Sequence, residues 1–461
     1  MKLLIMKILK IIFFTLFIVS CTTIQQSSNN PMNYSDKVLE KAKAIHNRVL
    51  VLDTHVDINV SNFTADKNYT KDIGNQVNLP NMEAGGLDVA WFIVYTGQGE
   101  LTPDGYDKAY ENAISKFDAI ERLTKEIAPQ RIGLAVSSKE ARELHAEGKK
   151  IAMIGVENAY PLGTDISRVK EFYDRGARYM SLSHNGHSQF CDSNTGEKDS
   201  LWIDKGVSNL GKQVIKEMNK WGMMIDVSHP SKQSIKDMIS LSKAPIIASH
   251  SSARALCNHS RNLDDEQLEW MKSNGGVVQT VAFSSYLNSE KHNAYSTAIS
   301  GKIENLAKER GIEMLSWDQI RKLETTERET YVKEYRAMSE EATLMMNDSD
   351  PKPVDVADFV DHIDYLVEKM GLDHVGISSD FDGGGGIYGW NDASETLNVT
   401  SELVKRGYTE DEIEKLWSGN LLRVLDEVDA VAKKLQAIDN CNLVRLFINL
   451  KNHLLRDGFY S

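Results

Sequence analysis

Cysteine is scarce in this chain: its 461 residues include only four, and no two of them form a CxxC pair. Cys21 lies close to the N-terminus, which leaves Cys191, Cys257 and Cys441 in the rest of the chain. An odd number of cysteines does not complete a disulfide framework, and isolated cysteines lack the spacing of a zinc-binding cluster. The sequence therefore argues against a disulfide-built fold and against catalysis or zinc binding by cysteine.

Basic residues are outnumbered as well. The chain has 53 Lys and Arg against 66 Asp and Glu, a formal net charge of −13, and no patch rich in Lys or Arg. Nucleic-acid-binding surfaces are basic, so we expect no nucleic-acid partner. The remaining composition, 41% hydrophobic and 26% charged, is that of a globular protein with enough residues for one large α/β domain or two smaller ones.

The apolar run at the N-terminus is too short to span a membrane comfortably. Residues 11–19 are predominantly apolar, Lys2, Lys7 and Lys10 precede them, and Ser20 follows. A basic segment, a short apolar segment and a small residue form the layout of a secretory signal peptide. An uncleaved anchor helix is the alternative.

The last four residues of this layout, Ile18-Val19-Ser20-Cys21, resemble a bacterial lipobox. The resemblance implies that residues 1–20 are a lipoprotein-type signal peptide and that a lipid on Cys21 attaches the mature protein to the membrane. Residues 21–33, rich in Gln, Ser and Asn, then form a flexible tether. We expect an extracytoplasmic, membrane-anchored lipoprotein on the periplasmic or cell-surface side of a bacterium.

Segments that favour β-strands alternate with segments that favour α-helices along most of the chain. Strands separated by helices form parallel βαβ units, and eight such units predict a (β/α)8 TIM-type barrel, an α/β fold. The catalytic groups of these barrels lie at the C-terminal ends of the strands. The eight predicted strands cover residues 49–57, 87–95, 151–156, 179–183, 223–228, 245–249, 276–283 and 375–379.

Two stretches depart from the repeat. Residues 288–370 are longer than a crossover helix requires and are rich in Glu, Lys and Met, so we expect a helical insertion that flanks the mouth of the active site. Residues 441–461 form a C-terminal tail with a helical apolar pattern. The predicted barrel domain, with its insertion, therefore covers residues 34–440.

Polar residues follow most of the predicted strands directly. The first strand ends in Asp53, His55 and Asp57, which share one face because side chains alternate along a strand. Taken alone, this motif is more simply a strand end that meets solvent. The pattern recurs, however, and a barrel brings all these ends to one rim. The later residues of this kind are Glu157, His229, His250 and Asp380.

Three imidazoles and several carboxylates at one rim suit two divalent metal ions such as zinc, with one carboxylate bridging them. Two ions roughly 3.5–4 Å apart share a hydroxide nucleophile and polarise the carbonyl that it attacks. The predicted reaction class is therefore metal-assisted hydrolysis at a binuclear site.

The order of the motifs resembles that of a known family, the membrane (renal) dipeptidases. These are zinc metallopeptidases related to the amidohydrolase superfamily, and the resemblance extends over about residues 49–428. The motifs, in order, are Asp53-x-His55-x-Asp57, Gly155-Val-Glu157-Asn158, Leu182-Ser-His184-Asn185, Asp226-Val-Ser-His229, Ser249-His250-Ser-Ser-Ala253, Arg261-Asn262, Gly376-Ile-Ser-Ser-Asp380-Phe-Asp382-Gly383 and Gly419-Asn420-Leu-Leu-Arg-Val.

The resemblance implies a ligand set for two Zn²⁺ ions per subunit. His55 and Asp57 would bind one ion, His229 and His250 the other, and Glu157 would bridge both. Asp53 is expected to support a ligating histidine from behind. Two departures from the family pattern, Asn158 and Ser379 in places where relatives have Gly, are expected to tune the shape of the pocket.

It also implies three roles toward a dipeptide substrate. His184 would stabilise the oxyanion of the tetrahedral intermediate, and Arg261 would bind the C-terminal carboxylate. Asp380 would accept a proton from the attacking water, pass it to the leaving amine and lie near the substrate ammonium. The alternatives are His187 in place of His184, Asp382 in place of Asp380, and a surface position for Arg261.

We therefore expect a zinc-dependent dipeptidase that also accepts a D-residue at the C-terminal position. The family is often dimeric, so a homodimer is a further expectation. One alternative is an amidohydrolase acting on a small amide, lactam or lactone. Another is a non-catalytic surface lipoprotein that binds peptide or metal, which the complete set of ligands disfavours.

Overall fold

The computed structural model describes the backbone of residues 32–456 and the side chains of residues 32–439, apart from residues 317, 325 and 329. The predicted signal peptide, Cys21, nearly all of the predicted tether and the last five residues of the predicted tail lie outside the described residues. No helix within the described range is long and apolar enough to cross a membrane. Cys191 and Cys257 are both buried and unpaired.

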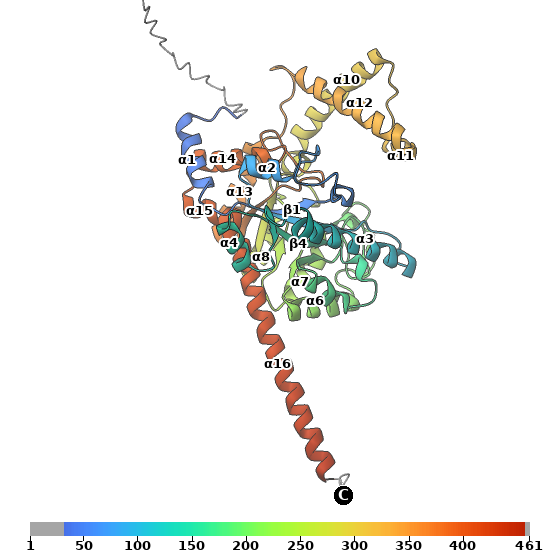
Figure 1. Ribbon diagram of the computed structural model, residues 1–461, viewed down its shortest axis with the longest axis vertical. Helices are drawn as coiled ribbons and strands as arrows, with labels where there is room; N and C mark the ends of the chain where they lie inside the picture. The colour runs from blue at the N-terminus through green and yellow to red at the C-terminus, as the bar shows by residue number, and fades with distance from the viewer. Residues whose placement is uncertain (1–31, 457–461) are drawn as a thin grey trace, which may run out of the picture.

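Parallel strands form a barrel at the centre of the molecule (Figure 1). The predicted (β/α)8 barrel is confirmed, and a strand lies within or overlaps each of the eight predicted segments. One short strand, β3 (Ile132–Leu134), pairs with the start of β4 and was not predicted, because three residues are too few to carry a pattern. In spatial order the barrel strands are β1 (Leu52–Asp57), β2 (Val89–Tyr95), β4 (Lys150–Glu157), β5 (Ala177–Ser181), β6 (Met224–Asp226), β7 (Ile247–Ala248), β8 (Val277–Val281) and β9 (Val375–Ser378).

The barrel closes where β1 meets the end of β9. The backbone N–H of Asp57 donates to the carbonyl of Phe381 at 2.9 Å. The buried carboxylate of Asp53 accepts the backbone N–H of Ser379 at 2.9 Å and also the Ser379 hydroxyl. Ser379 therefore contributes a hydrogen bond to this seam that a glycine would not supply. Asp53 also accepts the backbone N–H of His55 at 3.2 Å, so it supports this predicted ligand through the backbone and not through the ring.

Alternate residues of each strand pack on opposite sides of the barrel wall. In β2, Trp91 faces inward and stacks on Tyr179 of β5, with 5.1 Å between the ring centroids. Phe92, its neighbour, packs outward with the helices. The beginning of α16 (Asn420–Arg456) contributes Leu421 and Leu425 to the same apolar cluster as Trp91, and this packing fills one end of the barrel.

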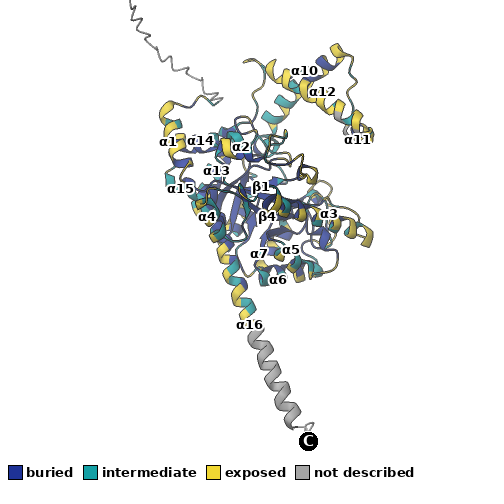
Figure 2. Cartoon of the chain, viewed as in Figure 1, coloured by how far each residue is buried: buried dark blue, intermediate teal, exposed yellow. Residues whose placement is uncertain are grey.

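Helices surround the strands, so the strands are buried while the outer helix faces are exposed (Figure 2). Most of these helices begin at a Ser, Thr, Asn or Asp whose side chain accepts a backbone N–H of the first turn, as Ser208 does for α6. The helices are α1 (Asp36–His46), α2 (Leu79–Gly85), α3 (Pro103–Arg122), α4 (Ser138–Ala146), α5 (Arg168–Asp174), α6 (Asn209–Trp221), α7 (Lys232–Leu241), α8 (Asp265–Asn274), α13 (Val356–Met370), α14 (Leu397–Arg406) and α15 (Glu410–Glu414).

Between β8 and β9 the chain forms an arm of helices that projects from the barrel (Figure 1). It has a small core of its own, which includes Ile303, Leu306 and Met338. The helical insertion expected over residues 288–370 is one helix too long. Its last helix, α13, belongs to the barrel, because Phe359 and Ile363 pack in the core of the barrel. The helices between β8 and α13 are α9 (Ser284–Leu287), α10 (Ser289–Arg310), α11 (Trp317–Lys322) and α12 (Thr325–Leu344).

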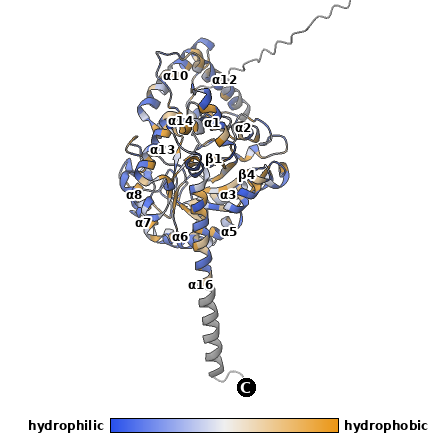
Figure 3. Cartoon of the chain, turned by 90° about the vertical axis from the view of Figure 1, so that its left-hand side faces the viewer, coloured by the Kyte–Doolittle hydropathy of each residue, from blue (hydrophilic) through white to orange (hydrophobic). Residues whose placement is uncertain are grey.

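The last helix, α16, continues beyond the barrel as a single rod in both side views (Figures 1 and 3). The predicted C-terminal tail, residues 441–461, begins inside this helix. The backbone of the tail therefore continues α16, the helix whose first residues fill one end of the barrel, as far as Arg456.

Candidate active site

The predicted site residues come together at the C-terminal end of the barrel. His55 lies within β1, and Asp57 and Glu157 end β1 and β4. Four residues follow closely after β5, β6, β7 and β9, namely His184, His229, His250 and Asp380, and Arg261 lies in the loop between β7 and α8. A cavity of about 580 Å³ lies there, a size typical of small-molecule sites. Of the eight predicted residues, His55 is buried beside the cavity, and the others line it: Asp57, Glu157, His184, His229, His250, Arg261 and Asp380.

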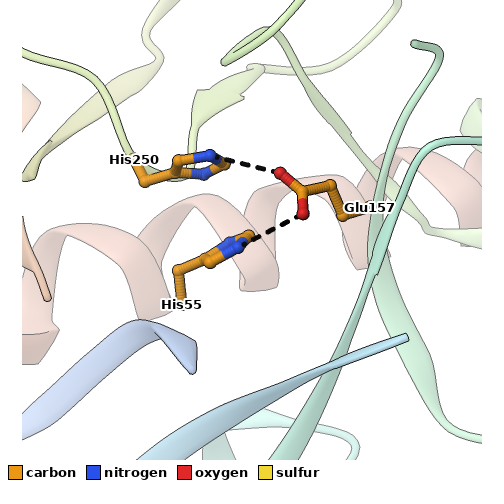
Figure 4. A group of neighbouring side chains, drawn as sticks. All are labelled: His55, Glu157 and His250. Atoms are coloured by element: carbon orange, nitrogen blue, oxygen red, sulfur yellow. Dashed lines mark ion pairs between the residues drawn. The ribbon is translucent and has the colours of Figure 1, made fainter. Parts of the chain in front are cut away.

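Glu157 lies between the imidazoles and presents one oxygen to each side (Figure 4). Its Oε1 lies 2.9 Å from His229 Nε2 and 3.3 Å from His250 Nε2, whereas Oε2 lies 3.6 Å from His55 Nε2. Burial disfavours the charged carboxylate, but the surrounding histidines outweigh burial and hold the pKa of Glu157 well below its usual range. A carboxylate in this position can give one oxygen to each of two neighbouring metal ions.

Imidazoles lie on both sides of Glu157. His229 and His250 bring their Nε2 atoms to within 3.1 Å of each other. On the other side, His55 Nε2 lies 3.5 Å from the nearer Asp57 oxygen and 3.9 Å from Asp380. The ring of His250 also lies 3.9 Å from that of His55, centroid to centroid, so the division of the ligands between two ions stays a prediction.

Buried hydroxyl groups orient two of these imidazoles. The Tyr179 hydroxyl donates to the Thr54 carbonyl at 3.0 Å, so it accepts the Nδ1–H of His55, 3.1 Å away. The Ser249 hydroxyl donates to Asp226 at 2.7 Å and accepts the Nδ1–H of His250 at 2.8 Å. In both histidines the Nε2 lone pair therefore faces the site.

This arrangement fits divalent metal ions. His55 Nε2 is buried and has no hydrogen-bond partner among the described residues. Three groups of His, Asp and Glu have ligand atoms within 4.8 Å of one another, and Glu157 belongs to two of them: His55, Glu157 and His250; Glu157, His184 and His229; and His55, Asp57 and Asp380. Convergent imidazole nitrogens and carboxylate oxygens are the ligands that zinc and similar cations accept.

Comparison with known proteins identifies the family. The family model described as membrane dipeptidase, peptidase family M19, matches residues 39–439. The chain belongs to this family. It is therefore a dipeptidase-like metallopeptidase, as the order of the motifs predicted.

Curated relatives of this M19 peptidase include fungal dipeptidases. Dipeptidase aclJ of Aspergillus oryzae is 27% identical over 401 residues, which cover 84% of this chain and 80% of the relative. Dipeptidase tcpJ of Claviceps purpurea is 27% identical over 368 residues, which cover 79% of this chain and 72% of the relative.

Solved structures with the same fold include two bacterial proteins. The probable dipeptidase PvdM from Pseudomonas aeruginosa is 33% identical with a TM-score of 0.71, and the match covers 87% of this chain and all of that one. A metallo peptidase from Rhodobacter sphaeroides, liganded with a phosphinate mimic of the dipeptide L-Ala-D-Ala, is 20% identical with a TM-score of 0.61. That match covers 82% of this chain and 99% of the Rhodobacter sphaeroides chain.

Arg261 of this M19 peptidase is buried at the cavity wall, so the alternative of a surface arginine is wrong. Its Nη2 donates to the carbonyl of His250 at 3.2 Å, and its cation lies 5.7 Å from the ring centroid of Tyr286. Its Nε and Nη1 are buried and have no acceptor in the described part of the chain. Two unused donors on a planar guanidinium suit a carboxylate ligand.

Asp380 has a strained backbone, with φ of 59°, in the region that favours glycine. Burial raises the pKa of its carboxyl to about 8, and the carboxylates of Asp57 and Glu157 add to this effect while His55 opposes it. Asp382, the alternative, uses its carboxylate to accept the backbone N–H groups of Gln76 and Val77. Of the two, Asp380 is thus the carboxyl that faces the histidines.

His184 rather than His187 faces the cavity. Its ring lies between Tyr95 and His229, with centroid distances of 4.8 Å and 4.2 Å, and burial lowers its pKa. The ring of His187 instead accepts the backbone N–H of Ser193 at 3.0 Å.

Several residues of the site carried no recognisable signal in the sequence. Tyr179 lies within an apolar strand, and only its contact with His55 reveals a role. Lys116 and Asn62 line the cavity from α3 and from a short 3-10 helix (Val60–Asn62), neither of which contains a motif. Asn158 has φ of 75°, and its side chain holds the backbone of Thr96 and Tyr160.

Proposed function

We propose that this M19 peptidase hydrolyses dipeptides with two zinc ions at the site around Glu157. The observation that carries the proposal is the division of the Glu157 carboxylate, with one oxygen toward His55 and the other toward His229 and His250. His55 and Asp57 would hold one ion, His229 and His250 the other. Two such ions, when bound, polarise a carbonyl and lower the pKa of a water molecule.

The free donors of Arg261 support binding of the substrate's C-terminal carboxylate. These donors are buried without acceptors, which costs free energy. A substrate carboxylate would accept charge-assisted hydrogen bonds from them and remove this cost. A D-residue at this position is part of the proposal, because the structurally similar metallo peptidase from Rhodobacter sphaeroides is liganded with a mimic of L-Ala-D-Ala.

Proton transfer is assigned to Asp380. Without bound metal, burial raises the pKa of Asp380 to about 8, and bound cations would lower this pKa. Asp380 would take a proton from the attacking water and give it to the leaving amine, and it would also face the substrate ammonium. His184 would donate a hydrogen bond to the substrate carbonyl oxygen as negative charge develops there.

The test is dipeptide hydrolysis by the protein without residues 1–20, measured with and without added zinc, beside Asp380→Asn and Glu157→Ala variants. We expect zinc-dependent turnover. Asp380→Asn should lower kcat by about 10²–10⁴-fold with metal content unchanged, whereas Glu157→Ala should lose both activity and metal. Full activity after thorough chelation, or two metals bound without turnover of any dipeptide, would contradict the proposal.

A panel of blocked substrates separates dipeptidase activity from action on other amides. Arg261 and Asp380 require both free termini, so N-blocked and C-amidated dipeptides should be poor substrates. Equal rates on blocked and free forms, or preferential cleavage of lactams or lactones, would instead favour a general amidohydrolase. Stoichiometric dipeptide binding without turnover would favour the non-catalytic alternative.

We also propose attachment to the membrane through a lipid on Cys21, and a homodimer. The support for attachment is the Ile18-Val19-Ser20-Cys21 sequence. A Cys21→Ala variant should move from the membrane fraction to the soluble extracytoplasmic fraction. Light scattering on the purified protein should give the mass of two chains, and the mass of one chain would reject the dimer.

A further inference from the structure

A buried lysine lines the cavity without any role in the proposed reaction. Lys116 of α3 is 8% exposed, and its ammonium lies 5.2 Å from the ring centroid of Tyr95. It forms no hydrogen bond or ion pair with the described residues. Burying a cation without a partner is costly, so an unpaired ammonium at a cavity wall indicates that its partner is a ligand.

Another buried cation of this protein shows the contrast. Arg178, equally buried, donates to the carbonyls of Val136, Tyr173 and Ala177. Arg261, by comparison, keeps two unused donors, and it lines the cavity as Lys116 does. Arg178 is thus satisfied by protein acceptors, whereas Arg261 and Lys116 have unused donors and line the cavity.

Asn62 lines the same cavity and is also unsatisfied. Its side chain is 9% exposed, and its amide oxygen has no hydrogen-bond partner in the part of the chain that the structure describes. An amide oxygen accepts hydrogen bonds. Asn62 therefore offers an acceptor to a ligand, whereas the Lys116 ammonium offers a donor to an anionic group.

The two unsatisfied cations have different neighbours within the site. Arg261 contacts the backbone of His250 and the ring of Tyr286. Lys116 packs on Tyr95, whose ring centroid lies 4.8 Å from that of His184. Lys116 therefore lies at the wall of the cavity that carries His184, whereas Arg261 lies beside His250.

We propose that Lys116 forms a subsite for an acidic side chain on the N-terminal residue of the substrate. The inference rests on the proposed function, in which Arg261 binds the C-terminal carboxylate and Asp380 faces the substrate ammonium. His184 would face the carbonyl oxygen of the first residue, so the side chain of that residue is the group of a dipeptide nearest to the wall that carries His184 and Lys116. The substrate class is then Asp-Xaa and Glu-Xaa dipeptides.

A purely structural role for Lys116, as counter-charge to the carboxylates of the site, makes a different prediction. The four carboxylates that line the cavity have other partners: Asp382 accepts the backbone N–H groups of Gln76 and Val77, and Asp57, Glu157 and Asp380 would face the two cations. Lys116 is then left without a counter-ion until an anionic side chain enters. A counter-charge role would affect every substrate equally, whereas a subsite affects only acidic ones.

The test compares kcat/KM for Glu-Ala and Gln-Ala, which differ in charge but hardly in shape, with the zinc-loaded protein. The wild type should prefer Glu-Ala by at least about tenfold. Lys116→Met keeps the length of the side chain against Tyr95 and should abolish the preference by slowing Glu-Ala alone. Lys116→Arg should retain it. Lys108→Met, the same change at an exposed position of α3, should leave the ratio unchanged.

Each contrary result has its own meaning. A wild type that hydrolyses both dipeptides equally overturns the subsite, and so does an equal loss on both substrates in Lys116→Met. A Lys116-dependent preference for Ala-Glu over Ala-Gln overturns the assignment to the N-terminal residue. Absence of hydrolysis of every dipeptide overturns the proposed function, and this inference with it.

Discussion

Hydroxyl groups behind the candidate metal ligands decide which imidazole nitrogen faces the site. Tyr179 accepts the Nδ1–H of His55, and Ser249 accepts that of His250. Without these acceptors each ring would populate both tautomers and rotate more freely. Partners of this kind commonly alter metal affinity by roughly 10–100-fold, although they never touch the ion.

Tyr179→Phe tests this role at the residue scale. The variant keeps the ring that stacks on Trp91 and removes only the hydroxyl. We expect metal affinity to fall by roughly tenfold or more, measured by competition with a chromogenic chelator. Tyr173→Phe, on the outer helix α5, is the control and should bind metal as the wild type does. Unchanged affinity in Tyr179→Phe would show that the ring of His55 is oriented by packing alone.

At the scale of secondary-structure elements, α13 connects the arm to the site. His362 of this helix accepts the backbone N–H of Ala253 at 3.1 Å and donates to the carbonyl of Leu287 at 2.9 Å. Ala253 lies in the loop that carries His250, and Leu287 ends α9. One neutral imidazole therefore ties a helix, a site loop and the start of the arm together. Protonation would place a hydrogen where Nδ1 now accepts one.

Burial lowers the pKa of His362 below its ordinary value of about 6.5. The unfolded chain therefore takes up this proton first as the pH falls. The resulting loss of stability begins near the unfolded pKa and is complete below the folded one, with about 1.4 kcal/mol lost for each unit between them. His362→Gln cannot be protonated, so its free energy of unfolding should change less between about pH 7.5 and about pH 5.5. Denaturant titrations at both pH values measure the difference, and equal losses in the two proteins would contradict the prediction.

The arm also reaches the mouth of the cavity. A Cβ placed on Gly74, which lines the cavity, would lie 3.3 Å from the guanidinium of Arg336 in α12. The expectation that the insertion flanks the active-site mouth therefore agrees with this close approach. A cation at the rim is also compatible with substrates that carry an extra negative charge.

At the scale of the whole molecule, the barrel depends on one seam between its first and last strands. The buried Asp53 carboxylate crosses this seam to the backbone and hydroxyl of Ser379. The same seam places Asp57 and Asp380 next to each other, since they follow directly on its two sides. The contacts between Asp53 and Ser379 therefore stabilise the barrel and also hold Asp57 and Asp380 in place at the site.

Ser379→Ala should destabilise the protein by about 1–3 kcal/mol, because a buried carboxylate loses a charge-assisted donor. Urea unfolding of the metal-free protein gives the change. Ser138→Ala removes a hydroxyl bonded to Asp426 at the surface, and it should change stability by about 0.5 kcal/mol or less. A loss in Ser379→Ala no larger than in this control would show that the seam does not depend on the hydroxyl.

The sequence by itself determined the barrel strands and the candidate metal ligands that the structure brings together. Both are local properties: an apolar run of strand length followed by His, Asp or Glu places those groups at a strand end, and parallel βαβ connectivity brings the ends to one rim. His55, Glu157, His229 and His250 were found in this way, and the order of the motifs indicated the family.

Only the tertiary structure decided which other residues join them. Tyr179 has the same pattern as any inward-facing strand residue, and Lys116 is one of several lysines of the chain that lie on helices, so nothing local marks either. α13 was assigned to the insertion because a sequence does not show which surface an apolar helix face meets. Contacts between residues far apart in the chain arise only on folding, and they set the orientation of His55, the burial of Lys116 and the two sides of Glu157.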